Sequence, residues 1–303
     1  MTAPLSTVPS AVPSAWRIWS IAARPRTLPL AAAPVLAGTA LAWAEQAPLL
    51  WGPALAALLA ALLIQIGTNL HNDAADFELG NDGVDRVGPL RVTAAGWASA
   101  RHVRTAARIT FALALLLGCY LVVVGGAFIL AIGCASLLAA QAYSGGPRPI
   151  SHTPLGELFV WVFFGLLAVA GSYWLQAGSV SPGAWLTGAA LGLPAAAVLL
   201  VNNLRDRETD RRAGRRTLAT LLNDPWARRV YAVLMLLPYA GLPLLAHWGR
   251  NGVWLTMLTL PFSLTLARRL LCGLAGPALN LHLAQTAQAA LAFALMLALG
   301  MLY

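Results

Sequence analysis

Residues 50–76 read LWGPALAALLAALLIQIGTNLHNDAAD, an apolar segment that ends in the polar block Asn72-Asp73-Ala74-Ala75-Asp76. The apolar part is long enough to cross a bilayer as a helix, which takes roughly 20 residues. In a helix, residues four positions apart lie on one face, about 6 Å apart along the axis. Asn72 and Asp76 are therefore predicted to share a face at the end of a membrane-spanning helix.

A second block repeats this arrangement further along the chain. The apolar segment that begins near residue 183 ends in Asn202-Asn203-Leu204-Arg205-Asp206, and Asp210 follows. Asn202, Asp206 and Asp210 are again four apart, so they too are predicted to share a face. Carboxylates stacked in this way repel one another unless a cation lies between them, and Mg2+ prefers oxygen ligands that often include substrate phosphates. Two such faces turned toward each other would form a metal site of the size of a diphosphate.

The composition places these blocks in a membrane protein. Of the 303 residues 59% are hydrophobic and only 10% are charged, and the mean hydropathy is +0.70, whereas a soluble protein carries about 25% charged residues. The sequence predicts an all-α polytopic membrane protein. We expect nine spans, at about 27–44, 50–72, 105–124, 126–143, 155–176, 183–204, 229–248, 252–271 and 281–303.

The distribution of charge gives an orientation. The net charge of +9 comes from arginine alone, since the chain has no lysine, and it does not indicate binding to nucleic acid. With a cytoplasmic N-terminus, the nine spans place every arginine except Arg250, and every acidic residue except Glu45, on the cytoplasmic side. This distribution fits the positive-inside rule. Both polar blocks and the loops after them, about 77–104 and 205–228, are thus predicted to be cytoplasmic, with the C-terminus outside.

The domain organisation is expected to be simple. Residues 1–16, MTAPLSTVPSAVPSAW, are rich in Pro and Ser and are predicted to form a disordered tail. No later segment resembles a linker between domains. Residues 17–303 are therefore predicted to form a single transmembrane domain.

Carboxylates and arginines at one face of a membrane bundle would suit an allylic diphosphate. Its apolar tail belongs in lipid, and Mg2+ ions and arginines would neutralise its anionic head. Charge developing on the leaving diphosphate would be stabilised, so that the C–O bond could ionise and an aromatic ring could capture the allylic cation. A cation-coupled transporter is the alternative from another class, but its ionisable groups usually lie near the middle of the bilayer.

The amino-acid sequences of both blocks resemble those of a known family. The first comprises Asn69 to Asp76, then Gly80, Asp82, Asp85-Arg86 and Gly88 to Arg91; the second comprises Asn202 to Asp210, then Gly214, Thr217 and Leu218. Together they resemble the signatures of UbiA-type intramembrane prenyltransferases, in particular the 1,4-dihydroxy-2-naphthoate polyprenyltransferase branch. The likeness covers most of the chain from about residue 17.

This resemblance implies a fold of nine transmembrane helices around a central cavity. It implies that a polyprenyl group passes from polyprenyl diphosphate to the naphthoate ring, with loss of CO2 and diphosphate, at the plasma membrane of a bacterium. The expected Mg2+ ligands are Asn72, Asp76, Asp82, Asn202, Asp206 and Asp210, of which Asp76 and Asp206 are expected to be essential for catalysis. The candidates for diphosphate contacts are Arg26, Arg86, Arg91, Arg148 and Arg215, and those for the aromatic acceptor are Tyr143 and Glu157. Asp73, Glu78 and Asp85 fit either a supporting role or ligation.

Two departures from the family pattern bear on the site. Arg215 stands where the second signature usually has lysine, and arginine differs from lysine in geometry. Ser151-His152-Thr153-Pro154 replaces a segment that commonly carries Tyr and Gly. Another aromatic acceptor, such as 4-hydroxybenzoate, homogentisate or a porphyrin, therefore stays open at this point.

Overall fold

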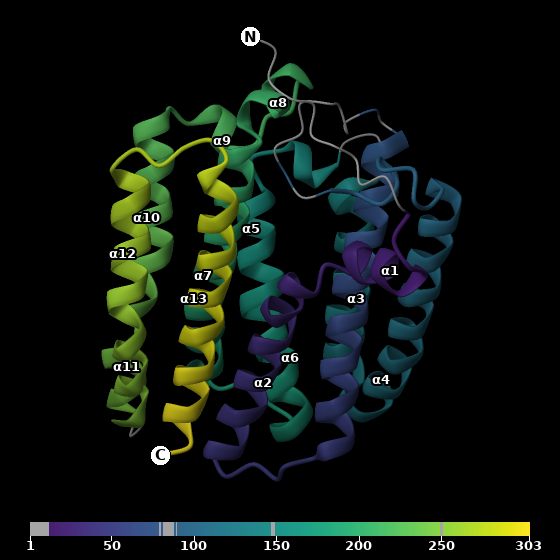
Figure 1. Ribbon diagram of the computed structural model, residues 1–303. Helices are drawn as coiled ribbons and strands as arrows, with labels where there is room; N and C mark the ends of the chain where they lie inside the picture. Colours follow the sequence, from purple (N-terminus) through teal and green to yellow (C-terminus); the bar gives the residue numbers. More distant parts are fainter. Residues whose placement is uncertain (1–11, 79, 81–87, 89, 147–148, 249–250) are drawn as a thin grey trace.

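The protein is an assembly of helices that stand side by side, as the computed structural model shows (Figure 1). The structure describes residues 12–78, 80, 88, 90–146, 149–248 and 251–303, and these residues form no strand. The longest helices are α2 (Leu28–Ala44), α3 (Trp51–Glu78), α4 (Ala100–Ser144), α7 (Pro182–Arg205), α10 (Asp224–Ala240) and α13 (Ala278–Met301). The shorter elements are α1 (Ala15–Ala23), η1 (Pro25–Thr27), η2 (Ile150–His152), α5 (Gly156–Trp161), the π-helical turn η3 (Val162–Leu167), α6 (Ala168–Ala177), α8 (Arg207–Arg212), α9 (Leu218–Leu221), α11 (Leu242–His247), η4 (Asn251–Thr259) and α12 (Leu260–Leu271).

The predicted all-α membrane fold is confirmed. Seven helical segments of the described chain are long and apolar enough to cross a membrane: Ala15–Ala44, Trp51–Glu78, Ala100–Tyr143, Gly156–Ala177, Pro182–Arg205, Asp224–His247 and Ala278–Met301. In the segment built on α7, 72% of the apolar window is buried, against 11% in α4. Helix α7 is therefore central to the assembly, and α4 is peripheral. The number of nine spans stays a prediction.

Helix α4 contains two of the predicted spans, which meet at Gly126. This glycine has φ 65° and ψ −152°, a backbone conformation that side chains with a Cβ rarely adopt. Near one end of α4, Arg104 pairs with Glu78 of α3. At its other end, a Cβ on Gly145 would lie 2.9 Å from Nε2 of His71, also on α3. Because both ends of α4 meet the same end of α3, the chain reverses direction at Gly126.

The segment 251–271 corresponds to another predicted span, but its first part is a 3₁₀ helix, η4. At one end, Gly252 packs so closely on α13 that an added Cβ would lie 2.2 Å from the carbonyl oxygen of Gly300. At the other end, Nη1 of Arg269 donates to Oε1 of Gln285, which lies in the first half of α13. The segment thus runs antiparallel to α13, and the α-helix α12 begins where Pro261 has no amide to donate.

The N-terminal region contains more structure than the sequence predicts. Helix α1 begins at Ala15, so the last two residues of the predicted tail, Ala15 and Trp16, are helical, while residues 1–11 lie outside the described range. Ile18 and Ala22 of α1 are buried against Leu70 of α3, whereas Trp16 is exposed. This amphipathic pattern packs α1 against the outside of α3 rather than leaving it in solvent.

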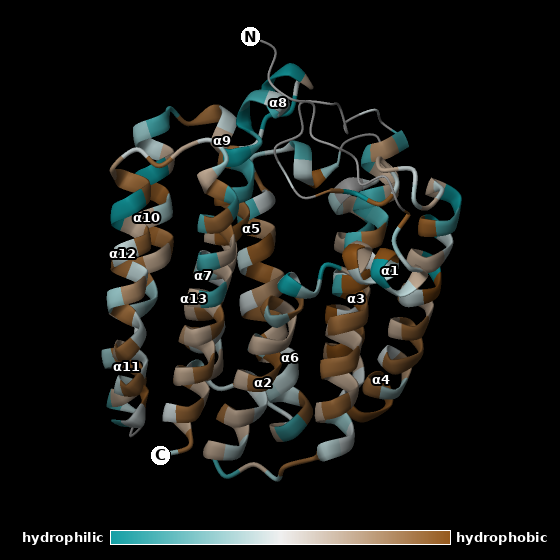
Figure 2. Ribbon diagram, viewed as in Figure 1, coloured by the Kyte–Doolittle hydropathy of each residue, from teal (hydrophilic) through white to brown (hydrophobic). Residues whose placement is uncertain are grey.

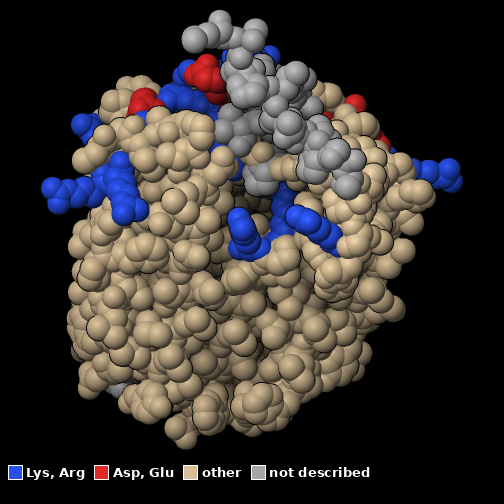
Figure 3. Space-filling view, in the orientation of Figure 1, with Lys and Arg blue, Asp and Glu red and all other residues tan. Residues whose placement is uncertain are grey.

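Charge gathers at one end of the molecule. In Figure 2 the elements around α8 and the loops beside it are hydrophilic, and the long helices below them are mostly hydrophobic. The space-filling view shows most acidic and basic side chains of this face at the same end (Figure 3). The C-terminus lies at the opposite end from α8 (Figure 1). The predicted separation of charge along the bundle is therefore present, and which end is cytoplasmic stays a prediction.

Close packing of α7 against η3 generates a test of the fold. A Cβ on Gly165 would lie 2.4 Å from the carbonyl oxygen of Gly188, whereas a Cβ on Gly133 of α4 would meet nothing within 4 Å. We expect Gly165→Ala to lower the stability of the protein by about 1–3 kcal/mol, because the helices must move apart. Thermal unfolding in detergent measures the effect, with Gly133→Ala as the matched control. Equal unfolding temperatures for the two variants would contradict this packing.

Candidate active site

The two polar blocks meet at the charged end of the bundle because each one ends a long helix. Helix α3 continues past its apolar part through Ala74 and Ala75 to Glu78, so Asn72 and Asp76 stay on one helical face as predicted. The second block is different. Helix α7 ends at Arg205, and Asp206 (φ −91°, ψ 6°) connects it to the short helix α8.

The second block is therefore not one uninterrupted helix, since Asp206 lies at a break between α7 and α8. Backbone hydrogen bonds between residues four positions apart nevertheless continue across this break. The amide of Asp206 donates to the carbonyl of Asn202 at 3.1 Å, and the amide of Asp210 donates to the carbonyl of Asp206 at 2.9 Å. Asn202, Asp206 and Asp210 thus still line one cavity.

This cavity has a volume of about 970 Å³. Figure 3 shows a hollow in the viewed face, with basic side chains at its rim. The polar wall carries ten side chains central to the site: Asn72, Asp76, Arg91, Tyr143, Asn202, Asn203, Arg205, Asp206, Asp210 and Arg215. The apolar wall includes Val35, Ile129, Phe163, Phe164 and Leu175. One end of the cavity suits an anion, and the remainder suits a hydrocarbon.

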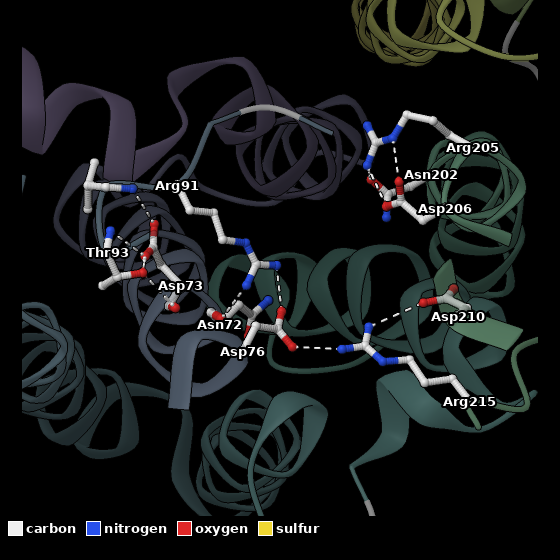
Figure 4. Close-up of polar contacts among 11 residues, drawn as sticks. Asn72, Asp73, Asp76, Arg91, Thr93, Asn202, Arg205, Asp206, Asp210 and Arg215 are labelled. Carbon is white, nitrogen blue, oxygen red and sulfur yellow. Dashed lines mark hydrogen bonds and ion pairs between the residues drawn. The ribbon is translucent and has the colours of Figure 1, made fainter. Parts of the chain in front are cut away.

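Asp76 is held by two arginines (Figure 4). Arg91 contacts Oδ2 of Asp76 at 2.5 Å, and Nη2 of Arg215 donates to Oδ1 at 2.9 Å. Nη1 of Arg215 also reaches Oδ1 of Asp210, at 3.4 Å. The guanidinium of Arg215 therefore connects the first polar block to the second.

Asp206 has its own arginine. Nε and Nη2 of Arg205 donate to the two carboxylate oxygens of Asp206 at 2.8 and 2.6 Å, a two-pronged pairing. Nη2 also donates to Oδ1 of Asn202, and Nη1 to Oδ1 of Asn280 on α13. The Arg205 side chain is buried, so it ties the second block to a helix that the sequence analysis did not connect with the site.

Asp73 points away from the cavity and anchors a loop. Its carboxylate accepts from the amides of Val92 and Thr93, at 3.2 Å each, and from the Thr93 hydroxyl. Figure 4 shows this cluster on the other side of α3 from Asp76. Asp73 therefore supports the segment that carries Arg91, and Glu78, paired with Arg104 at the surface, does not reach the cavity.

The electrostatics of the second block follow from burial. Burial raises the pKa of Asp210 to about 6, and the nearby guanidinium of Arg215 opposes this rise. Burial lowers the pKa of His152 in η2, and Arg215 adds to that effect. At neutral pH we therefore expect Asp210 to be ionised and His152 to be uncharged.

The donor set fits Mg2+. The carboxylates of Asp76, Asp206 and Asp210 and the amide oxygens of Asn72 and Asn202 belong to residues of the cavity wall, and oxygen is the ligand that this ion prefers. Oδ1 of Asn72 is buried and has no hydrogen-bond partner within the described chain, which leaves a buried acceptor for a cation or its water. No three His, Cys, Asp or Glu side chains of the described residues come close enough to hold a metal alone. Mg2+ in proteins commonly relies on one or two carboxylates, water and substrate phosphates.

The other predicted site residues differ in whether they reach the cavity. Tyr143 lines the cavity, and Glu157 is buried just behind its wall, where Oε1 accepts from Asn203 at 2.9 Å. Arg26 is exposed and is not among the lining residues, whereas Arg24 is. Asp82, Asp85, Arg86 and Arg148 lie outside the described residues.

A polar cluster beside Asn72 was not predicted from the sequence. Nε2 of Gln65 donates to Oγ1 of Thr27 and to Oδ1 of Asn69, and Nδ2 of Asn69 donates to Oγ1 of Thr27 and to the carbonyl oxygen of Ala23. Thr27, Gln65 and Asn69 all line the cavity. The signal was present, because Gln65, Asn69, Asn72 and Asp76 follow one another at spacings of three and four on α3.

Known proteins of similar sequence indicate a family for this chain. The sequence profile of the UbiA prenyltransferase family matches residues 31–275. The 1,4-dihydroxy-2-naphthoate octaprenyltransferase of Escherichia coli is 39% identical over 93% of this chain and 94% of its own. The enzyme of that name from Mycobacterium tuberculosis is 42% identical over 72% of this chain and 74% of its own.

Solved structures share the fold. A UbiA homologue from Aeropyrum pernix superposes with a TM-score of 0.67 at 16% identity, covering 89% of this chain and 96% of that one. A UbiA homologue from Archaeoglobus fulgidus bound to DMAPP and Mg2+ has a TM-score of 0.58 at 16% identity, covering 92% and 99%. At these identities the likeness concerns the arrangement of helices.

The position of Asp73 generates a test of the site. We expect Asp73→Asn to lower stability by about 1–3 kcal/mol, because the amide cannot accept the full set of buried hydrogen bonds. Thermal unfolding measures the change, with Glu208→Gln, at an exposed carboxylate, as the control. Wild-type stability combined with weaker metal binding would instead make Asp73 a ligand.

Proposed function

Because this chain belongs to the UbiA prenyltransferase family, we propose that it transfers a polyprenyl group from polyprenyl diphosphate to 1,4-dihydroxy-2-naphthoate. The prenyl group replaces the carboxylate on the ring, so the products are CO2, diphosphate and demethylmenaquinol, the reduced form of demethylmenaquinone. The observation that carries this proposal is a cavity whose polar end gathers carboxylates and guanidiniums while its remaining wall is apolar. A polyprenyl diphosphate has the same division between head and tail.

The residues that would hold Mg2+ are Asn72, Asp76, Asp206 and Asp210, with Asn202 beside them; Asp82, the other candidate from the sequence, lies outside the described residues. When bound, the ion neutralises the diphosphate and stabilises the charge that develops on it as it leaves. Arg91 and Arg215 would contact the remaining oxygens, a role supported by the presence of both residues in the polar wall. Paired donors of this kind stabilise a leaving group best when they are fixed before the reaction.

The apolar wall protects the reactive carbon. Phe163 and Phe164 lie on the π-helical turn η3, and both face the cavity. A π-turn of this kind is often found at a functional site. Aromatic and aliphatic side chains here keep water away from the allylic cation until the acceptor ring captures it.

The acceptor is proposed to lie near Tyr143 and the pair formed by Glu157 and Asn203. Tyr143 and Asn203 line the cavity, and Oε2 of Glu157 is a buried acceptor with no hydrogen-bond partner in the described part of the chain. The choice of naphthoate rests on the relatives, whose names specify this acceptor. We further propose that the end carrying the site faces the cytoplasm of a bacterial cell.

Loss of the proposed ligands tests this function. We expect Asp76→Ala or Asp206→Ala to reduce turnover at least about a hundredfold, because each removes a group that stabilises the transition state. The assay uses detergent-purified protein, a long polyprenyl diphosphate and the naphthoate, with Mg2+ or with EDTA. Glu208→Ala is the matched control, and near-normal turnover in either aspartate variant would exclude that residue from the metal site.

The acceptor is tested in the same assay by offering 4-hydroxybenzoate in parallel. We expect Mg2+-dependent product from the naphthoate only. Product from the benzoate alone would support prenyl transfer and show that the acceptor is not the naphthoate. Folded protein that gives no product from either acceptor would contradict the proposed transfer.

A further inference from the structure

Arg215 occupies the position between the two polar blocks where a cation would bind. We propose that Arg215 latches the blocks together while the site is empty, so that the divalent metal binds strongly only with the diphosphate. This inference rests on the proposed function, since it concerns how the same site takes up its ligands. It assigns to Arg215 a positioning role in addition to diphosphate contact.

The first support is the geometry of the bridge. One guanidinium nitrogen of Arg215 lies 2.9 Å from Asp76 of α3, and another lies 3.4 Å from Asp210 of α8. The side chains of Arg215, Asp76 and Asp210 are only 17%, 12% and 7% exposed. Ion pairs that are this well shielded are stronger than surface pairs, because water screens them less.

The second support is that the backbone fixes the latch in place. The amide of Arg215 donates to the carbonyl of Asp210 at 2.9 Å, and the amide of Arg216 donates to the carbonyl of His152 at 3.0 Å. The chain at Arg215 is therefore held between the end of α8 and η2. Its guanidinium can change partners by side-chain rotation alone, without moving either helix.

The third support is the charge of the cavity. Each described carboxylate that lines it already faces a guanidinium: Asp76 faces Arg91 and Arg215, Asp206 faces Arg205, and Asp210 faces Arg215. Among the described lining residues, five arginines (Arg24, Arg91, Arg205, Arg212 and Arg215) accompany these three carboxylates. A divalent cation alone would thus have to displace a guanidinium from each of these three carboxylates that it contacts.

A diphosphate changes this balance. Its oxygens offer the guanidiniums new anionic partners, with which arginine pairs strongly. As Arg215 turns to the diphosphate, Asp76 and Asp210 become available to the metal. Each ligand then increases the affinity for the other by the same factor, as linkage requires.

The fork of arginine is essential to this latch. A planar guanidinium presents several donors in fixed directions and can contact two carboxylates at once, whereas a lysine ammonium is a compact point charge. Arg215→Lys therefore keeps the charge and weakens the bridge. It provides a second variant if Arg215→Ala does not fold.

The experiment measures Mn2+ binding to the full-length protein in detergent, from the electron paramagnetic resonance signal of the free ion. The titration is run alone and with geranyl S-thiolodiphosphate, an allylic diphosphate analogue that ionises poorly. For the wild type we expect the analogue to increase Mn2+ affinity at least about tenfold. For Arg215→Ala and Arg215→Lys we expect Mn2+ alone to bind more tightly than to the wild type, by about tenfold for the alanine variant, and the enhancement by the analogue to shrink.

Arg216→Ala is the matched control, because its side chain is exposed and only its amide takes part in the contact described above. It should behave as the wild type. Equal Mn2+ affinity of the wild type with and without the analogue would overturn the latch, as would Mn2+ binding that weakens or stays unchanged in both Arg215 variants. If Mn2+ and the analogue fail to bind in any combination, the proposed function fails as well, whereas binding without mutual enhancement overturns the latch alone.

Discussion

Neutralising buried carboxylates at one end of an otherwise apolar bundle is the constraint on which the rest of the structure depends. Asp76, Asp206 and Asp210 line a cavity between helices, where an unpaired charge is very unfavourable. The neutralising groups are arginines from three separate segments, namely Arg91, Arg205 and Arg215. The Asp73 carboxylate holds the segment that carries Arg91. The arginines that neutralise these carboxylates also line the wall at which we propose that the diphosphate binds.

The helices position this charged end above an apolar space. Helix α7 is central and mostly buried, and its glycines allow η3 to approach closely. The reversal at Gly126 brings both halves of α4 to the cavity wall, through Gly118 and Leu121 on one side and Ile129 and Gly133 on the other. The cavity therefore has an apolar part that suits a long hydrocarbon chain, next to a charged part that suits an anionic head.

Part of the candidate site could be predicted from the spacing of residues along the sequence. The four-residue spacing of Asn72 and Asp76 correctly predicted a shared face, because α3 stays regular to its end. The same spacing in the second block did not predict the helix break at Asp206, or the hydrogen bond from Arg205 to Asn280 of α13, because a contact between distant segments is not encoded in local spacing. Whether Arg24 or Arg26 reaches the cavity depends on the left-handed conformation of Arg24, which no spacing rule reveals. The bridge by Arg215 joins residues 139 positions apart, and only the folded chain brings them together.

The central claim is that the ends of α3 and α7 form one metal and diphosphate site. The most direct measurement is an experimental structure of the protein with Mn2+ and the thiolodiphosphate analogue, in which anomalous scattering locates the metal. We expect metal between the two helix ends, coordinated by oxygens of Asp76 and of Asp206 or Asp210 together with the analogue. Metal held by only one of the two blocks, or located away from the cavity, would contradict it.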